Sequence, residues 1–255
     1  MSGEKSIIDD LQKCNIKINN YRTINNAVAV ELNATHLKVD KVPGLKTLLY
    51  PHQKTVVKGM LDSEYYRSFN ASNYQVCYSA DVLSEPVGSG KTVDILALIC
   101  LQKIPRAVPD IMRFDLNNNS QVVGYIRRRF KKFLLPTIIF VGSSVMKQWE
   151  RAIKTFTDFK SYSVNSVVEL KSLFEMISSR TINRYDIVLV KNGKITVPIK
   201  LPDDIKLEPK NKVGQPFIYN LIANLSEYCW ARVVIDDFDT IKLPHNAGIV
   251  PGIFT

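Results

Sequence analysis

Short runs of consecutive apolar residues alternate along the chain with longer segments whose apolar residues recur at helical spacing. The short runs are typical of strands that are buried on both faces of a sheet. We expect such strands from Asp81 onward and over 137–141, 162–164, 186–190 and 233–235. We expect helices over 92–102, 145–154, 167–177 and 217–228. The alternation predicts an α/β fold with a mostly parallel central sheet flanked by helices.

The amino-terminal part follows this alternation less closely. Residues 1–45 predict a short helix over 6–14 and a strand over 27–32, and we interpret them as an extension packed on a main domain of residues 46–255. Pro51 suits the first turn of a helix over 48–61, because proline has no N–H group to leave unbonded there.

Turn-forming residues predict two hairpins and one irregular insertion. Residues 65–80 alternate aromatic and polar side chains around a polar turn. Asn192 and Gly193 stand between two alternating runs, a pair that favours a tight turn into a strand over 194–198. Residues 103–136 contain prolines and an asparagine run and predict an irregular stretch.

A glycine-rich segment between the strand at Asp81 and the helix over 92–102 is the strongest chemical signal. Gly88, Ser89 and Gly90 would let the backbone approach phosphate oxygens, and the helix start adds the positive end of its dipole. Lys91 would reach the β- and γ-phosphates of a nucleotide, and the Thr92 hydroxyl would bind Mg²⁺. We call residues 84–92 the phosphate loop.

Three carboxylates follow the apolar run over 233–235, namely Asp236, Asp237 and Asp239. An aspartate at a strand end, downstream of a phosphate loop, is typical of a Mg²⁺ ligand, and the adjacent acid can orient or deprotonate the attacking water. Turns and helix caps also contain such pairs. The position after the phosphate loop favours the magnesium site, with Asp236 as the ligand.

Polar side chains at two further places fit a nucleotide site or a polymer site. Gln53, at the start of the helix over 48–61, has a donor and an acceptor that match the edge of adenine. Ser143 and Ser144 follow the strand over 137–141, and Ser143 is a good cap for the next helix. Ligands of α/β folds bind at such strand ends.

Positive charge bears on the partner. The 255 residues include 34 Lys and Arg against 24 Asp and Glu, a net charge of +10, which suits nucleic acid. The stretch 125–133 interleaves Arg127, Arg128 and Arg129 with aromatic residues, and it fits either of two structures. It grips a phosphate backbone and stacks on bases, or it is a solvated helix with Ile126, Phe130 and Phe133 facing the core.

Cysteine and histidine positions predict no metal site. The four cysteines form no Cys-x-x-Cys pair, and the three histidines are scattered. Free thiols, the absence of a membrane-length apolar run and the absence of a signal peptide predict an intracellular protein, cytoplasmic or nuclear.

In this order the motifs resemble the first RecA-like lobe of a superfamily 2 helicase or translocase, with the Swi/Snf-type branch as the most similar. Residues 50–53 resemble the adenine-reading Q motif, 84–92 motif I, 137–153 motif Ia and 230–239 motif II. The chain also resembles proteins of large DNA viruses of protists, and a viral source would place it in the viral factory.

The resemblance implies a helicase-type ATP hydrolase that uses ATP and Mg²⁺ and acts on nucleic acid, with DNA preferred to RNA. Gln53 would contact adenine, and Ser143, Ser144 and Lys147 would lie near the nucleic-acid backbone. The residues expected to hold the nucleotide and its metal are Gly88, Ser89, Gly90, Lys91, Thr92 and Asp236, with Asp237 as the catalytic acid.

Two departures leave an alternative open. Glu85 stands where the phosphate-loop consensus has glycine, and Asp237 stands where the family has glutamate, which withdraws the carboxylate by about 1 Å. The chain ends before the family's second lobe, so we expect a lobe with little activity by itself. The alternative is a non-catalytic module that binds nucleic acid or protein on a degenerate lobe. A small-molecule kinase or a GTPase fits less well, since no Asn-Lys-x-Asp segment is present.

Overall fold

The computed structural model describes residues 37–66, 68–71, 74–77, 80–105, 121–123, 132–205, 213–223, 225, 228–236 and 252–254. The helix expected over 6–14 and the strand over 27–32 lie outside these residues. So do Arg127, Arg128, Arg129 and Asp237.

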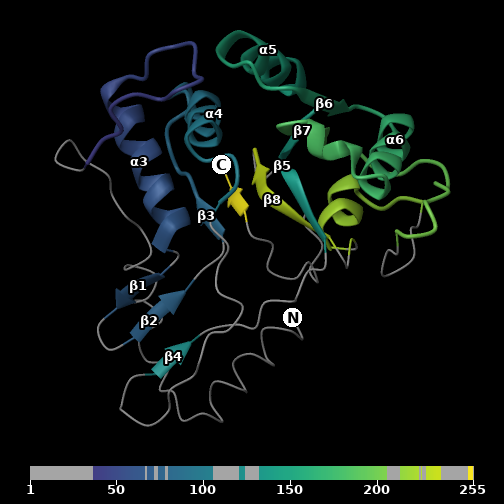
Figure 1. Ribbon diagram of the computed structural model, residues 1–255. Coiled ribbons are helices and arrows are strands. Elements are labelled where there is room, and N and C mark those ends of the chain that lie inside the picture. Colours follow the sequence, from purple (N-terminus) through teal and green to yellow (C-terminus); the bar gives the residue numbers. More distant parts are fainter. Residues whose placement is uncertain are drawn as a thin grey trace.

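A six-stranded sheet forms the centre of the chain, in the order β3-β9-β8-β5-β7-β6, and all of its pairings are parallel (Figure 1). Its strands are β3 (Ala80–Val82), β5 (Lys132–Val141), β6 (Ser161–Val164), β7 (Ile187–Lys191), β8 (Tyr228–Ile235) and β9 (Gly252–Phe254). The predicted α/β fold with a RecA-like parallel sheet is confirmed.

Helices cover both faces of this sheet (Figure 1). They are α3 (Pro51–Tyr66), α4 (Lys91–Leu101), α5 (Met146–Phe156) and α6 (Val167–Ser178), with a 3₁₀ turn η1 (Thr181–Arg184). In β5, Ile139 and Val141 pack with α3, α4 and α5, whereas Ile138 and Phe140 pack with α6 and the segment around Phe217. Successive strand residues point to opposite faces, so a continuous apolar run is needed to fill both cores.

A small second sheet follows α3. Its strands are β1 (Ser68–Ala71), β2 (Tyr74–Cys77) and β4 (Gln121–Val123). β1 and β2 are antiparallel, with Ala71 opposite Tyr74, which confirms the hairpin predicted over 65–80. β4 lies within the stretch expected to be irregular and pairs with β2 in parallel.

The hairpin predicted at Asn192 and Gly193 is wrong. Gly193 has no positive φ, which the tight turn needs, and Lys194 instead forms an isolated antiparallel bridge with Pro216. A Cβ added to Gly193 would lie 3.1 Å from the Phe217 ring, so glycine here allows close packing.

Three other local predictions also differ from the structure. The helix expected over 217–228 is short, with a π-helical part η2 (Tyr219–Ala223), because β8 already begins at Tyr228. The strand at Asp81 is an edge strand rather than a buried one, and Val82 is 75% exposed. Phe133 lies in β5, not on a helix, and is exposed.

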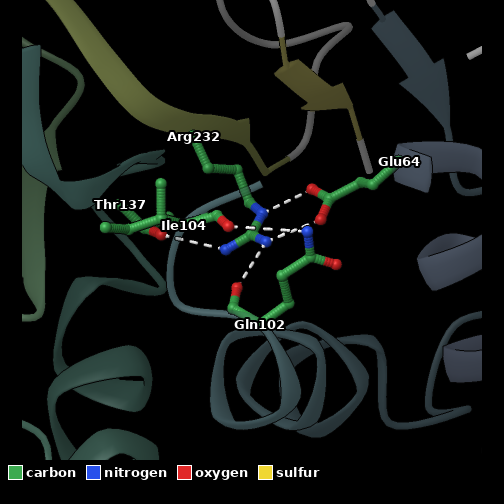
Figure 2. Close-up of polar contacts among 5 residues, drawn as sticks. All are labelled: Glu64, Gln102, Ile104, Thr137 and Arg232. Carbon is green, nitrogen blue, oxygen red and sulfur yellow. Dashed lines mark hydrogen bonds and ion pairs between the residues drawn. The ribbon is translucent and has the colours of Figure 1, made fainter. Parts of the chain in front are cut away.

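A buried ion pair connects α3 to the sheet (Figure 2). Arg232 of β8 donates from Nε to Glu64 Oε1 at 2.6 Å and from an Nη atom to Glu64 Oε2 at 2.7 Å. The guanidinium also donates to the Gln102 carbonyl at the end of α4 and to the Thr137 hydroxyl of β5. Both partners are buried. The buried guanidinium charge of Arg232 is therefore satisfied by four hydrogen bonds, which it donates to groups on three neighbouring elements.

Candidate nucleotide site

The phosphate loop joins β3 to α4 as the sequence predicts. Gly88 and Gly90 have φ values of +87° and +99°, in the left-handed region that glycine adopts without strain. Gly90 occupies the N-cap position of α4, and its carbonyl accepts a hydrogen bond from the Val93 N–H at 2.8 Å. The loop therefore leads directly into a helix start, a position whose N–H groups can bind an anion.

Lys91 bends back over the loop. Its Nζ donates to the carbonyl oxygens of Glu85 at 3.0 Å and Pro86 at 3.2 Å. The Ser89 hydroxyl donates to a carboxylate oxygen of Glu85 at 3.2 Å. Since an ammonium group binds charged oxygens more strongly than neutral carbonyls, these bonds can be exchanged for bonds to phosphate.

Gln53 lies directly beneath the loop. Its side chain is 3% exposed, and its Oε1 accepts a hydrogen bond from the Tyr50 N–H at 3.0 Å. A Cβ added to Gly90 would lie 2.5 Å from Gln53 Nε2. The amide thus contacts the loop at a position where a side chain would displace it, and its contact with adenine stays a prediction.

Asp94, in the first turn of α4, is a second buried polar group beside the loop. It is fully buried, and neither of its carboxylate oxygens has a hydrogen-bond partner among the residues that the structure describes. Burial, and then the nearby charge of Glu85, raise the pKa of Asp94 to about 8. The loop is therefore supported by a carboxyl group that favours its neutral form.

Asp236 follows the carboxyl end of β8. Its N–H donates to the Phe140 carbonyl of β5 at 2.9 Å, which continues the pairing of the two strands by one residue. Its Oδ2 accepts a hydrogen bond from Trp149 Nε1 of α5 at 2.6 Å. Both the main chain and the carboxylate are fixed by neighbouring elements.

The strand order brings the phosphate loop and Asp236 to the same edge of the sheet, the one formed by the carboxyl ends of the strands. β3, β9 and β8 are neighbours and run parallel, so their carboxyl ends lie together. With about 4.8 Å between strands, β3 and β8 are about 10 Å apart. Lys91 and Asp236, distant in the sequence, therefore lie at the same end of strands two positions apart.

The turn after β5 lies at this edge as well. Ser143 and Ser144 are exposed, and so is Lys147 in the first turn of α5. The predicted cap is wrong, because the N-cap of α5 is Val145 and no side chain caps it. The Val145 N–H donates to the Gly142 carbonyl and closes the turn, which leaves both serine side chains exposed.

Oxygen donors for a metal ion are few. Across the described ranges, no group of three or more His, Cys, Asp or Glu side chains is placed to hold a metal. Thr92, at the second position of α4, and Asp236 fit Mg²⁺ bound together with a triphosphate. This ion takes one or two protein oxygens and completes its shell with phosphate oxygens and water.

Sequence reasoning gave no role to three side chains at this edge. Glu85 departs from the phosphate-loop consensus, and its carboxylate accepts a hydrogen bond from the Ser89 hydroxyl. Asp94 interrupts an apolar helix, and a charged residue at such a position can be used to predict a functional site. Trp149 lies in the segment similar to motif Ia, but its bond to Asp236 spans 87 residues and cannot be deduced from spacing.

In the described parts of the chain, no helix has the length and apolar character required to cross a membrane. A family described as "SNF2-related domain" matches residues 52–247, well over half of the chain. The match spans Gln53, the phosphate loop, the turn after β5 and Asp236. The chain belongs to the SNF2-related family, and its α/β fold is that of a Swi/Snf-like lobe of the superfamily 2 helicase type.

Proposed function

We propose that this chain is the ATP-binding lobe of a nucleic-acid-dependent ATPase, either a helicase or a DNA translocase. The observation that carries the proposal is the strand order, which brings the phosphate loop and Asp236 to one edge of a parallel sheet. Membership in the SNF2-related family supports the same reaction class.

Each residue at this edge has a proposed role toward ATP. The N–H groups of residues 88–90 bind phosphate oxygens, and Lys91 exchanges its bonds to Glu85 and Pro86 for the β- and γ-phosphates. Thr92 and Asp236 hold Mg²⁺, which neutralises charge on the phosphates when bound. Asp237 orients or deprotonates the attacking water, and Gln53 reads the adenine edge.

Nucleic acid is the proposed second partner. Ser143, Ser144 and Lys147 are exposed next to Asp236 and offer hydroxyl and ammonium groups to a phosphate backbone. Arg127, Arg128 and Arg129 add positive charge to a chain whose net charge is +10. We propose DNA in preference to RNA, and a location in the cytoplasm or the nucleus.

Removal of the Lys91 ammonium tests the phosphate loop. We expect Lys91→Ala to weaken binding of a fluorescent ATP analogue by about 10- to 100-fold, since a charge-assisted bond is worth about 1.5–3 kcal/mol. Fluorescence anisotropy measures the affinity. Lys171→Ala is the matched control, because Lys171 lies on α6 and pairs with Glu175. Equal affinity of Lys91→Ala and the unchanged protein would remove the loop from the site.

Glu85 favours a second candidate, a non-catalytic binding module. Its carboxylate lies within the phosphate loop and holds Ser89, where it would repel phosphate oxygens. If the unchanged protein binds no ATP analogue in the same titration but retains affinity for DNA, this candidate replaces the first.

A further inference from the structure

Trp149 forms a hydrogen bond with the Asp236 carboxylate. The indole Nε1–H donates to Asp236 Oδ2 at 2.6 Å, a short charge-assisted hydrogen bond. Trp149 is 1% exposed and lies in the first turn of α5, where its own N–H donates to the Val145 carbonyl. The backbone of Trp149 is therefore fixed by its helix, and its indole is buried in the core.

An aspartate at a strand end otherwise keeps rotational freedom about its side-chain bonds. Here the main chain of Asp236 is fixed by its bond to Phe140 and one carboxylate oxygen is fixed by Trp149. These two constraints restrict the orientations open to the carboxylate. A ligand oxygen that is oriented in advance binds a metal ion more tightly than one that must be ordered on binding.

We infer that Trp149 is a positioning residue whose indole N–H holds the Asp236 carboxylate in the orientation that serves Mg²⁺ bound with ATP. The inference rests on the proposed function. Trp149 is almost fully buried, and it acts through Asp236. Its contribution is the one hydrogen bond to Oδ2.

The chain has a matched control for this bond. It contains two tryptophans, and the second, Trp230 of β8, is also buried. Trp230 donates its Nε1–H to the Leu221 carbonyl at 2.8 Å, in the core on the α6 side of the sheet. Trp149→Phe and Trp230→Phe each keep an aromatic ring and delete one buried indole N–H bond. Only the first deletion reaches Asp236.

The test is the magnesium dependence of nucleotide binding. A fluorescent, non-hydrolysable ATP analogue is titrated at a series of Mg²⁺ concentrations and in excess EDTA, with anisotropy as the readout. We expect Trp149→Phe to raise the Mg²⁺ concentration needed for half-maximal enhancement by about 10-fold. Binding in EDTA should stay unchanged, and Trp230→Phe should behave as the unchanged protein in both conditions.

A second readout does not need the Trp149 variant to fold. In Trp230→Phe, Trp149 is the one remaining tryptophan, so its emission reports on the hydrogen bond to Asp236. Addition of Mg²⁺ with the analogue should change this emission, and Mg²⁺-free analogue should not.

Three results would overturn the inference. Equal magnesium dependence in Trp149→Phe and the unchanged protein would show that the bond does not position the ligand. A Trp149 emission that does not change when Mg²⁺ is added with the analogue would show the same. No binding by the unchanged protein at any Mg²⁺ concentration would instead remove the proposed function, and the inference with it.

Discussion

Glu64 and Asp94 are both buried carboxylic acids on the helices that cover one face of the sheet, but their surroundings differ. Glu64, on α3, receives two N–H groups from Arg232 (Figure 2). Asp94, on α4, makes no hydrogen bond of normal geometry with any described residue, although Gln53 and Glu85 are close enough to affect its pKa. One acid completes a polar network, whereas the other leaves one incomplete beside the phosphate loop.

The difference separates a part of the chain that stabilises the fold from the part that we propose as the nucleotide site. A buried polar group without a partner costs free energy, and native proteins retain few of them. Such groups, and residues in strained conformations, concentrate at functional sites. Asp94 lies in the first turn of the helix that follows the phosphate loop and fits this pattern.

Removal of Arg232 should have the largest effect on the fold. Arg232→Met leaves the Glu64 carboxylate buried without its cation, so the free energy of unfolding should fall by about 3–5 kcal/mol. Urea unfolding followed by circular dichroism measures it. The double variant Arg232→Met with Glu64→Leu should recover most of the loss, because no charge remains buried. A single variant as stable as the unchanged protein would contradict the role given to this pair.

Replacement of Asp94 should change how stability depends on pH. The pKa is raised from 3.8 to about 8, so between these values the folded state retains a proton that the unfolded state releases. The neutral Asp94 carboxyl therefore adds to the free energy of unfolding at low pH. This contribution falls as pH rises, by up to about 3 kcal/mol from pH 5 to pH 7.

Asp94→Asn should remove this slope, as measured by urea unfolding without nucleotide at each pH. Asp203→Asn, which alters an exposed side chain, should keep the slope of the unchanged protein. If Asp94→Asn shows the same slope as the unchanged protein, the carboxyl group is not neutral in the folded state.

Two alanine substitutions in the phosphate loop should give the smallest difference in the free energy of unfolding. Gly88→Ala and Gly90→Ala both force alanine into the left-handed region, at about 1–2 kcal/mol each. The Cβ at position 88 meets open space, whereas that at position 90 displaces Gln53 from its bond to Tyr50. Gly90→Ala should therefore cost about 1 kcal/mol more.

A double-mutant cycle checks the cause of this difference. In a Gln53→Ala background, the two alanine variants should lose equal free energy of unfolding, measured with urea. A difference that persists there would mean that Gln53 does not explain the requirement for glycine at position 90.

Local pattern predicted most of the sheet and of the phosphate loop. Continuous apolar runs marked β7 and the carboxyl-terminal parts of β5 and β8, where the strands are buried on both faces. Glycine and lysine between an expected strand and an expected helix indicated the loop, whose geometry requires φ values that other residues avoid.

The remaining features depend on contacts between distant segments. Glu64 and Arg232 are 168 residues apart, and neither position by itself indicates a buried pair. Asn192 and Gly193 have the composition of a tight turn, but Gly193 instead packs closely against the distant Phe217 ring. The burial of Asp94 follows from the packing of α3 on α4, which periodicity along one helix does not reveal.

The pairing of β3 with β9 has a consequence for the order in which the protein acquires its structure. Within the described sheet, β3 contacts β9 alone, so residues 80–82 obtain their strand partner only from residues 252–254. During synthesis on the ribosome, most of the chain must emerge before this edge can close. Pairings of such long sequence separation are slow to form. The phosphate loop should therefore be among the last parts of the nascent protein to become ordered.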